Sequence, residues 1–379
     1  KSTCANRLSV YVNTNQLPLA QDLGLNIIGT FGPSPLTSAQ IAEIAKNKPD
    51  IIIDNVHNPV AAPAKQVSES SVIIEWRNFP DTIEGDNLLY NVVFKNIDLF
   101  FSSYDMTSLS EPKDLKILKQ AYPDVTFESE YDSEKNDYLI TVSVEDRQKD
   151  FYWANGKLLP ESELSNEKNY RSVFYEYPDK IPDPQYFTDE YIQQIKDATS
   201  FETRQNGDEL SYFFYDLLYQ SDSRKTVERR ISSYKFLGKY PNVHDRIKEP
   251  LARVEKKIME LSKEDNEVRE FLEKLLSVDC YNWRDIEDSG KKSVHSFGIA
   301  LDVLPKGWGQ KNVYWAWRRD IDKENWMKLS LDRRWTPPEK VIEIFEQEGF
   351  VYGGKWMVWD NMHFEYFPEV ILYNKLVEK

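Results

Sequence analysis

Residues 293–303, SVHSFGIALDV, constrain the fold of this chain more than any other stretch. In the GIALDVL part, apolar side chains alternate with Ala300 and Asp302, the pattern of a β-strand with one face in a core. Asp302 shares its face with the smallest side chain of the strand, so that face has room for a ligand. Gly298 lets the chain bend before the strand, so that His295 can approach Asp302. The stretch predicts a buried strand that brings an imidazole and a carboxylate together.

A second motif, WDNMHFEYFPE at residues 359–369, supplies further ligand types. On a strand in this region His363 and Glu365 share one face, and Asp360 lies three residues before His363. Two neutral imidazoles and one carboxylate make a three-ligand zinc set, whose fourth position stays open for water. A further carboxylate then serves as the proton acceptor. The first motif by itself also fits a hydrogen-bonded structural pair, and the ligand set also suits another first-row metal ion.

The composition, with 40% hydrophobic and 13% aromatic residues, is typical of a packed globular protein. A length of 379 residues predicts two or three domains. The net charge of −15 argues against nucleic acid or an anionic membrane surface as a partner. No apolar run approaches the roughly 18 residues of a membrane span. The sequence leaves the oligomeric state open.

The two cysteines, Cys4 and Cys280, are too few for a disulfide framework and lack the spacing of a metal site. The sequence starts at Lys1 rather than at methionine, which is compatible with an export signal removed ahead of it. Cys4 fits either a lipid-anchoring cysteine or an ordinary N-terminal thiol. The residues before it, KST, lack the apolar character of a lipidation signal, and this favours the ordinary thiol.

Residues 1–104 show the pattern of an α/β segment. Short β-rich runs flank a helix with Thr37 as its N-cap and Gln40 three residues later, a capping box. The order strand, helix, strand predicts a parallel sheet. The stretch LTSAQIAEIAKNKPDIIIDNVHNP resembles part of a bacterial solute-binding protein of the metal-uptake or siderophore type. Because only part of such a protein is covered, no ligand follows, and we interpret His57 as a surface residue.

The rest of the chain divides into three regions. Residues 105–186 are β-rich, and residues 187–277 are helical and lead into the last region. Residues 278–379 contain eight of the ten tryptophans and a helix predicted from Pro337 onward, with Thr336 as its N-cap. We expect this last region to be α+β, with a small antiparallel sheet and helices packed to one side.

Together the two motifs resemble the zinc peptidases of bacterial cell walls. This family includes the VanY-like D-alanyl-D-alanine carboxypeptidases and the L-alanyl-D-glutamate endopeptidases of phage endolysins. Its pattern is Ser-x-His-x2-Gly-x-Ala-x-Asp, then an acid three residues before a second histidine, and every element is present. With the upstream YNWRDIEDSG, the resemblance covers residues 278–379 and, loosely, the helical region before them. It implies an extracytoplasmic enzyme of the cell envelope that acts on the stem peptide of peptidoglycan.

The resemblance also implies roles for individual residues. His295, Asp302 and His363 would bind Zn²⁺. Asp360 would be the general base, which takes a proton from the water activated by the metal and passes it to the leaving amine. Arg284, eleven residues before His295, would stabilise the oxyanion.

Four further residues near the two motifs are expected to support the metal ligands or to line the substrate site. Ser293 is expected to form a hydrogen bond within its loop and to orient a ligand. Glu365 does not match the spacing of the base, so we assign it to support of a ligand or to an ion pair. Trp356 and Trp359 flank the base and are candidates for the wall of a substrate groove, although core packing is the commoner role of such aromatic residues.

The resemblance leaves the cleaved bond open. Aspartate at position 360 is typical of the L-Ala–D-Glu enzymes, whereas the carboxypeptidases often have glutamate there. The sequence MHFEYFPE favours the VanY-like branch. We therefore predict a D-alanyl-D-alanine carboxypeptidase first and an L-alanyl-D-glutamate endopeptidase second. An alternative of another class is a catalytically inactive module that binds peptidoglycan, and the complete set of ligands, base and arginine argues against it.

Overall fold

The computed structural model describes residues 8–79, 89–103, 111–112, 114–132, 134–286 and 289–377. The chain divides into two compact units, one of residues 1–113 and 133–136 and the other of residues 114–132 and 137–379. Cys4 and the predicted boundary after residue 104 lie outside the described residues. Among the described helices, none has the length and apolar character required to cross a membrane.

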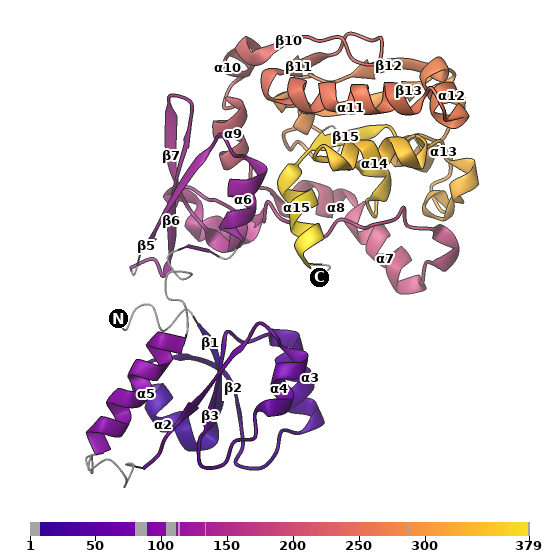
Figure 1. The fold of residues 1–379 in the computed structure, drawn as a ribbon. Coiled ribbons are helices and arrows are strands. Elements are labelled where there is room, and N and C mark those ends of the chain that lie inside the picture. Colours follow the sequence, from indigo (N-terminus) through magenta and orange to yellow (C-terminus); the bar gives the residue numbers. More distant parts are fainter. Residues whose placement is uncertain are drawn as a thin grey trace. The chain divides into compact units, whose positions relative to one another are not determined.

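The first unit is built on a parallel sheet in the order β2–β1–β3–β4. Its strands are β1 (Ser9–Asn13), β2 (Asn26–Phe31), β3 (Ile51–Asn55) and β4 (Val72–Trp76), and its helices are α2 (Leu17–Asp22), α3 (Ser38–Asn47), α4 (Ala62–Val67) and α5 (Leu89–Ser103) (Figure 1). Along β3, Ile51 and Ile53 pack in one apolar cluster and Ile52 in another. The isoleucine run is therefore buried on both faces, as in a central strand of a parallel sheet.

The capping box predicted at the start of α3 is present. The Gln40 N–H donates to Thr37 Oγ1 (3.3 Å), and the Thr37 N–H donates to Gln40 Oε1 (3.0 Å). These reciprocal bonds satisfy two N–H groups that the helix leaves open. His57 is exposed after β3, with its ring 5.7 Å from that of Phe79.

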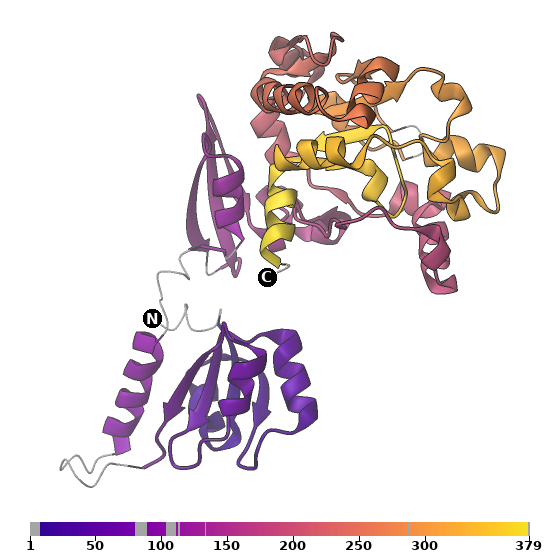
Figure 2. The same cartoon turned by 45° about the vertical axis from the view of Figure 1, so that its right-hand side comes forward.

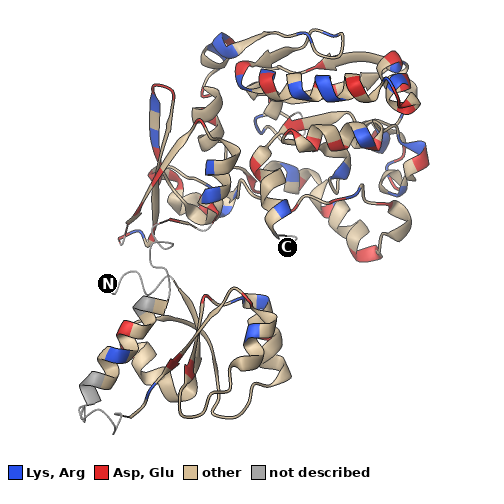
Figure 3. Ribbon diagram, viewed as in Figure 1, with Lys and Arg blue, Asp and Glu red and all other residues tan. Residues whose placement is uncertain are grey.

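The second unit begins with α6 (Leu115–Ala121) and an antiparallel sheet of β5 (Thr126–Asp132), β6 (Asp137–Val144) and β7 (Arg147–Tyr152). Both views show this sheet at one side of the unit, with α6 beside it (Figure 1 and Figure 2). The elements that follow are β8 (Tyr170–Arg171), α7 (Asp189–Ala198), α8 (Phe201–Asn206), β9 (Glu209–Leu210), α9 (Phe213–Tyr219), α10 (Arg224–Val227), β10 (Ile231–Ser233), β11 (Asn242–His244), α11 (Lys248–Leu261) and α12 (Asn266–Lys274). Basic and acidic residues are interspersed along α11 (Figure 3).

A four-stranded antiparallel sheet forms the C-terminal part, in the order β12–β13–β15–β14. Its strands are β12 (Leu275–Asp279), β13 (Ala300–Pro305), β14 (Phe350–Tyr352) and β15 (His363–Tyr366), accompanied by α13 (Trp315–Ile321), α14 (Glu339–Gln347) and α15 (Pro368–Val377). Phe345 of α14 stacks on Phe364 of β15, with ring centroids 4.1 Å apart. The small antiparallel sheet predicted for this region is confirmed. One hydrophobic core extends from Leu115 to Ile371, so the β-rich, helical and C-terminal regions share their packing.

Helix α14 begins two residues later than predicted. Its N-cap is Pro338, and Thr336 lies before the helix instead of capping it. The reason is the pair of prolines, because Pro337 precedes a second proline and is disfavoured in the helical region. The helix starts at Glu339, once both prolines are passed.

Glu369, at the start of α15, is a fully buried carboxyl group with 0% of its surface exposed. It accepts hydrogen bonds from the hydroxyl groups of Tyr122 (2.6 Å) and Tyr215 (2.5 Å), which lie on the chain after α6 and within α9. Burial raises the pKa of Glu369 to about 7, against a smaller lowering by the two tyrosine hydrogen bonds. The carboxyl group therefore joins three segments that are distant in the sequence.

Glu369→Gln should weaken the pH dependence of stability. The folded-state pKa of about 7 lies above the ordinary 4.5, so the folded protein binds more protons between these values. The free energy of unfolding therefore falls as the pH rises through this window, by at most about 1.4 kcal/mol per pH unit from this group. Urea unfolding at several pH values within the window measures the slope. Glu249→Gln, at an exposed position, serves as the control, and an unchanged slope in Glu369→Gln would contradict the assignment.

Candidate active site

Three elements of the C-terminal sheet position the predicted ligands. Asp302 of β13 lies directly opposite His363 of β15, so their side chains share one face of the sheet. His295 lies in a 3₁₀ turn, Val294–Phe297, that leads into β13. Gly298 ends this turn at φ +72°, and a Cβ atom there would lie 2.3 Å from Ile231 Cδ1. The positive φ therefore favours glycine at this position, and the end of the Ile231 side chain would have to shift for any other residue.

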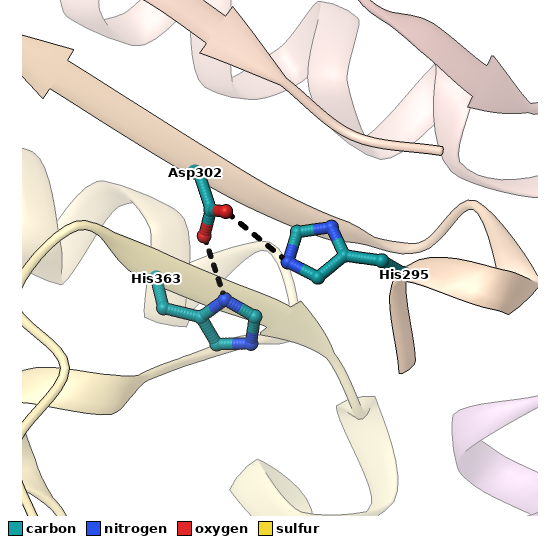
Figure 4. Close-up of side chains that lie close together, drawn as sticks. All are labelled: His295, Asp302 and His363. Carbon is teal, nitrogen blue, oxygen red and sulfur yellow. Dashed lines mark hydrogen bonds and ion pairs between the residues drawn. The ribbon is translucent and has the colours of Figure 1, made fainter. Parts of the chain in front are cut away.

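The structure brings His295, Asp302 and His363 together. Asp302 Oδ1 is 2.8 Å from His363 Nδ1, and Asp302 Oδ2 is 3.3 Å from His295 Nε2. Figure 4 shows the two imidazoles approaching the two oxygens of one carboxylate. One ligand atom from each residue lies within 4.8 Å of the others, and the ring centroids of the two histidines are 5.0 Å apart. Among the described residues, this is the group that could hold a metal ion.

The outer nitrogen of each imidazole has its own hydrogen-bond partner. His295 Nδ1 is 2.6 Å from the carbonyl oxygen of Cys280, so it must be the N–H donor of the neutral ring. His363 Nε2 is 2.9 Å from Glu365 Oε1, and it donates in the same way. When a metal ion keeps both rings neutral, the nitrogens that face Asp302 would have lone pairs available to that ion. Such outer hydrogen bonds fix the tautomer and orientation of metal-binding histidines, so the residues fit a divalent ion.

The electrostatics of the cluster favour a positive charge. Burial raises the pKa of Asp302, but the neighbouring His295 and His363 outweigh it and hold this pKa well below its usual range. Burial lowers the pKa of His363, but its hydrogen bonds to Asp302 and Glu365 outweigh that effect and raise the pKa. The lowered pKa of Asp302 and the raised pKa of His363 both indicate that a positive charge is favoured beside these carboxylates. A bound metal ion would supply that charge and leave the imidazoles neutral.

Asp360 lies beside the cluster but outside the group that could hold a metal ion. Its N–H donates to the carbonyl of Gly353 (3.0 Å), and its backbone pairs with that of Tyr314. A Cβ atom on Gly353 would lie 2.7 Å from the Asp360 carbonyl oxygen, so glycine permits this close turn. Asp360 Oδ1 is buried without a hydrogen-bond partner among the described residues. Burial raises the pKa of Asp360 to about 7, and this carboxylate has an acceptor atom available for a proton.

A cavity of about 320 Å³ opens beside the cluster. Its lining includes His295, Asp302 and Arg284, so the predicted oxyanion arginine borders the same space as two of the ligands. Asp279 of β12 also lines the cavity, and it is paired with Asp302 on the neighbouring strand β13. Asp279 is not among the residues predicted from the sequence, although its position at the end of a β-rich run, LLSVD, is a usable signal. The Cys280 carbonyl was also missed, because a backbone acceptor has no signal in the sequence.

Comparison with known protein families gives one match over this site. Residues 287–366 match the model of a family described as D-alanyl-D-alanine carboxypeptidase. The site lies in a peptidase-like segment. A second family model, described as a domain of unknown function, matches residues 114–175. Neither the search of curated proteins nor the search of solved structures found a match.

The D-alanyl-D-alanine carboxypeptidase match includes His295, Asp302, Asp360 and His363, whereas Arg284 precedes it. The Arg284 side chain is exposed, and its backbone is tied to the histidine turn. Its N–H donates to Ser296 Oγ (3.0 Å), and its carbonyl accepts from the Ser293 N–H (3.1 Å). These bonds hold the arginine segment beside the ligands.

The supporting residues of the carboxypeptidase-like segment differ in their surroundings. Ser293 Oγ accepts a hydrogen bond from the His295 N–H (3.3 Å), within the turn as expected. Trp356 is half-buried, with its ring 5.6 Å from that of His363. Trp359 has only 2% of its surface exposed and packs with Trp315 and Trp326 in a separate apolar cluster. The structure places Trp359 in the core rather than on a groove wall, because its indole fills this cluster.

Proposed function

We propose that the protein is a zinc-dependent metallopeptidase that hydrolyses D-amino-acid-containing stem peptides of peptidoglycan, as a D-alanyl-D-alanine carboxypeptidase. The observation that carries the proposal is the convergence of His295 Nε2, His363 Nδ1 and the Asp302 carboxylate, with the outer nitrogens already hydrogen-bonded. The family match over residues 287–366 supports the peptidase class. Because its substrate lies in the cell wall, the enzyme would act outside the cytoplasm.

The residues of the site divide the chemistry among them. Zinc, when held by His295, Asp302 and His363, supplies a Lewis acid and lowers the pKa of a water molecule. Asp360 accepts the proton of the attacking water and passes it to the leaving amine. Arg284 stabilises the negative charge that develops on the carbonyl oxygen, and removal of such a group typically costs about 3–4 kcal/mol of barrier stabilisation. Glu365 holds the His363 ring in its orientation.

Digestion of muropeptides tests the proposed specificity. The purified protein with Zn²⁺ should shorten pentapeptide stems by one terminal D-alanine, because the proposed reaction removes a single C-terminal residue. Mass spectrometry of the products identifies the cleaved bond, and His363→Ala serves as the inactive control. Intact stems at saturating Zn²⁺ would contradict the enzymatic proposal, above all if the protein bound purified sacculi without turnover. That result would favour a binding module.

The L-alanyl-D-glutamate endopeptidase is the second candidate. The observation that favours it is the residue type of Asp360, which is one methylene group shorter than the glutamate frequent in carboxypeptidases. In the same digestion, this enzyme would separate L-alanine from the rest of the stem and leave the terminal D-alanine in place. One experiment therefore distinguishes the two candidates.

A further inference from the structure

Three aromatic side chains form a row at the surface of the second unit: Trp308, Tyr314 and Trp317. The ring of Trp317 lies 5.1 Å from that of Trp308, tilted by 35°, and 5.5 Å from that of Tyr314, edge to face. Trp317 lies on α13 with 42% of its surface exposed, and Trp308 and Tyr314 are half-buried. A tryptophan this exposed gains little from the core, so its surface is available to a ligand.

The aromatic row starts beside the proposed general base. Tyr314 pairs with Asp360 in an antiparallel bridge, and residues paired in this way project their side chains on the same face. Two further hydrogen bonds fix the two segments, from the Trp315 N–H to the Trp359 carbonyl (3.2 Å) and from the Asn361 N–H to the Val313 carbonyl (2.8 Å). The row is therefore joined to the Asp360 segment through Tyr314, and the Trp317 ring contacts those of both Tyr314 and Trp308.

The charges around the row restrict the kind of ligand. Lys311 is exposed, and Arg318 and Arg319, which follow Trp317 on α13, form ion pairs with Asp322 (3.2 Å) and Asp320 (3.5 Å). The Arg319 guanidinium lies 4.9 Å from the centroid of the Trp315 ring and already occupies a cation site there. Because both arginines are already paired with aspartates, a charged ligand group would gain little here, and the row suits an uncharged ring. Sugar rings fit this description, because their C–H faces pack on aromatic rings while their hydroxyl and amide oxygens accept hydrogen bonds from Lys and Arg.

We propose that the aromatic row binds the sugar rings of the glycan to which the stem peptide is attached. The inference rests on the proposed function, because it requires a stem peptide that is bound at the catalytic residues while its sugar-bearing end reaches the aromatic row. Trp317 and Trp308 provide the stacking surface, and Tyr314 links it to the catalytic residues. The enzyme then prefers a peptide that still carries its sugar over the same peptide in free form.

Two substrates with one peptide test the proposal: the free stem peptide, and the same peptide joined to its N-acetylated disaccharide. For the wild-type protein, kcat/KM should be higher for the sugar-bearing substrate. In Trp317→Ala the ratio of the two kcat/KM values should fall about tenfold, equivalent to about 1.4 kcal/mol, with the loss in KM. Trp317→Phe should retain part of the ratio, and Ile321→Ala, at a position on the same helix with 74% exposure, should leave it unchanged.

An equal loss on both substrates, or no change in the ratio, would overturn the proposal, and circular dichroism shows whether each variant is folded. A second measurement does not depend on turnover: quenching of tryptophan fluorescence by chitin oligosaccharides should be present in the wild type and lost in Trp317→Ala. If the protein cleaves neither peptide but shows this quenching, the proposed function fails and the sugar site stands. If Trp317→Ala loses only binding to phosphatidylglycerol vesicles, the row is a membrane contact and the sugar proposal is wrong.

Discussion

His363→Ala is expected to abolish both zinc retention and peptide hydrolysis. The substitution removes one of three ligand residues and leaves Asp302 and Glu365 without the imidazole that each contacts. Loss of an outer hydrogen-bond partner alone typically costs about 10–100-fold in metal affinity or activity, so loss of the ligand itself should exceed that range. Zinc in the dialysed protein is measured by elemental analysis, and hydrolysis by the release of D-alanine from a stem pentapeptide.

His57→Ala provides the matched control for this variant. His57 is an exposed histidine of the first unit, so its removal should change neither zinc content nor turnover. Comparable activity in His363→Ala and the wild type would exclude the proposed site. A folded variant that keeps one zinc per chain would instead show that the metal binds elsewhere.

Asp360→Asn should separate metal binding from turnover. Asp360 lies outside the ligand group, so the variant should keep its zinc. The amide cannot accept the proton of the attacking water, and the loss of a general base typically lowers the rate about 10²–10⁴-fold. The neutral side chain nearly matches the shape of the carboxyl group in its buried position, so the fold should persist. Zinc content and kcat measured on one preparation give both results.

Glu249→Gln, at an exposed carboxylate that does not belong to the candidate site, serves as the control. Zinc loss in Asp360→Asn would identify Asp360 as a ligand and reverse the assigned roles. Retention of both zinc and full turnover would require another base, and Glu365 and Asp279 are the nearby carboxylates to examine next.

The local parts of the fold were predictable because their determinants lie within a few residues of one another. The Thr37 capping box and the strand that carries Asp302 follow from side-chain types at fixed spacing. The predicted start of α14 at Pro337 is wrong because Pro338 disfavours a helical conformation at Pro337. The capping pattern at Thr336 does not contain this restriction. The position of Trp359 in the core could not be predicted either, since neither composition nor spacing distinguishes a buried indole from one at the surface.

The site was predictable in its residue types and not in its hydrogen bonds. The sequence pattern identified two histidines and a carboxylate as candidate ligands. The pairing of β13 with β15 could not be predicted in the same way, because it depends on contacts between residues about sixty positions apart. The partner of His295 is the main-chain carbonyl of Cys280, which every residue type possesses. The shared hydrophobic core could not be predicted from local sequence either, because its residues on α6 and α15 are more than two hundred positions apart.

The bonds between Glu369 and the two tyrosines have a consequence for any attempt to divide this chain into fragments. Tyr122 lies in the stretch matched by the domain of unknown function, and Glu369 follows the stretch matched by the carboxypeptidase family. A C-terminal fragment made without residues 114–175 would lack the Tyr122 hydroxyl and would leave the Glu369 carboxyl group beside uncovered apolar side chains. The part of the chain matched by the carboxypeptidase family is therefore expected to need the segment around Tyr122 in order to fold.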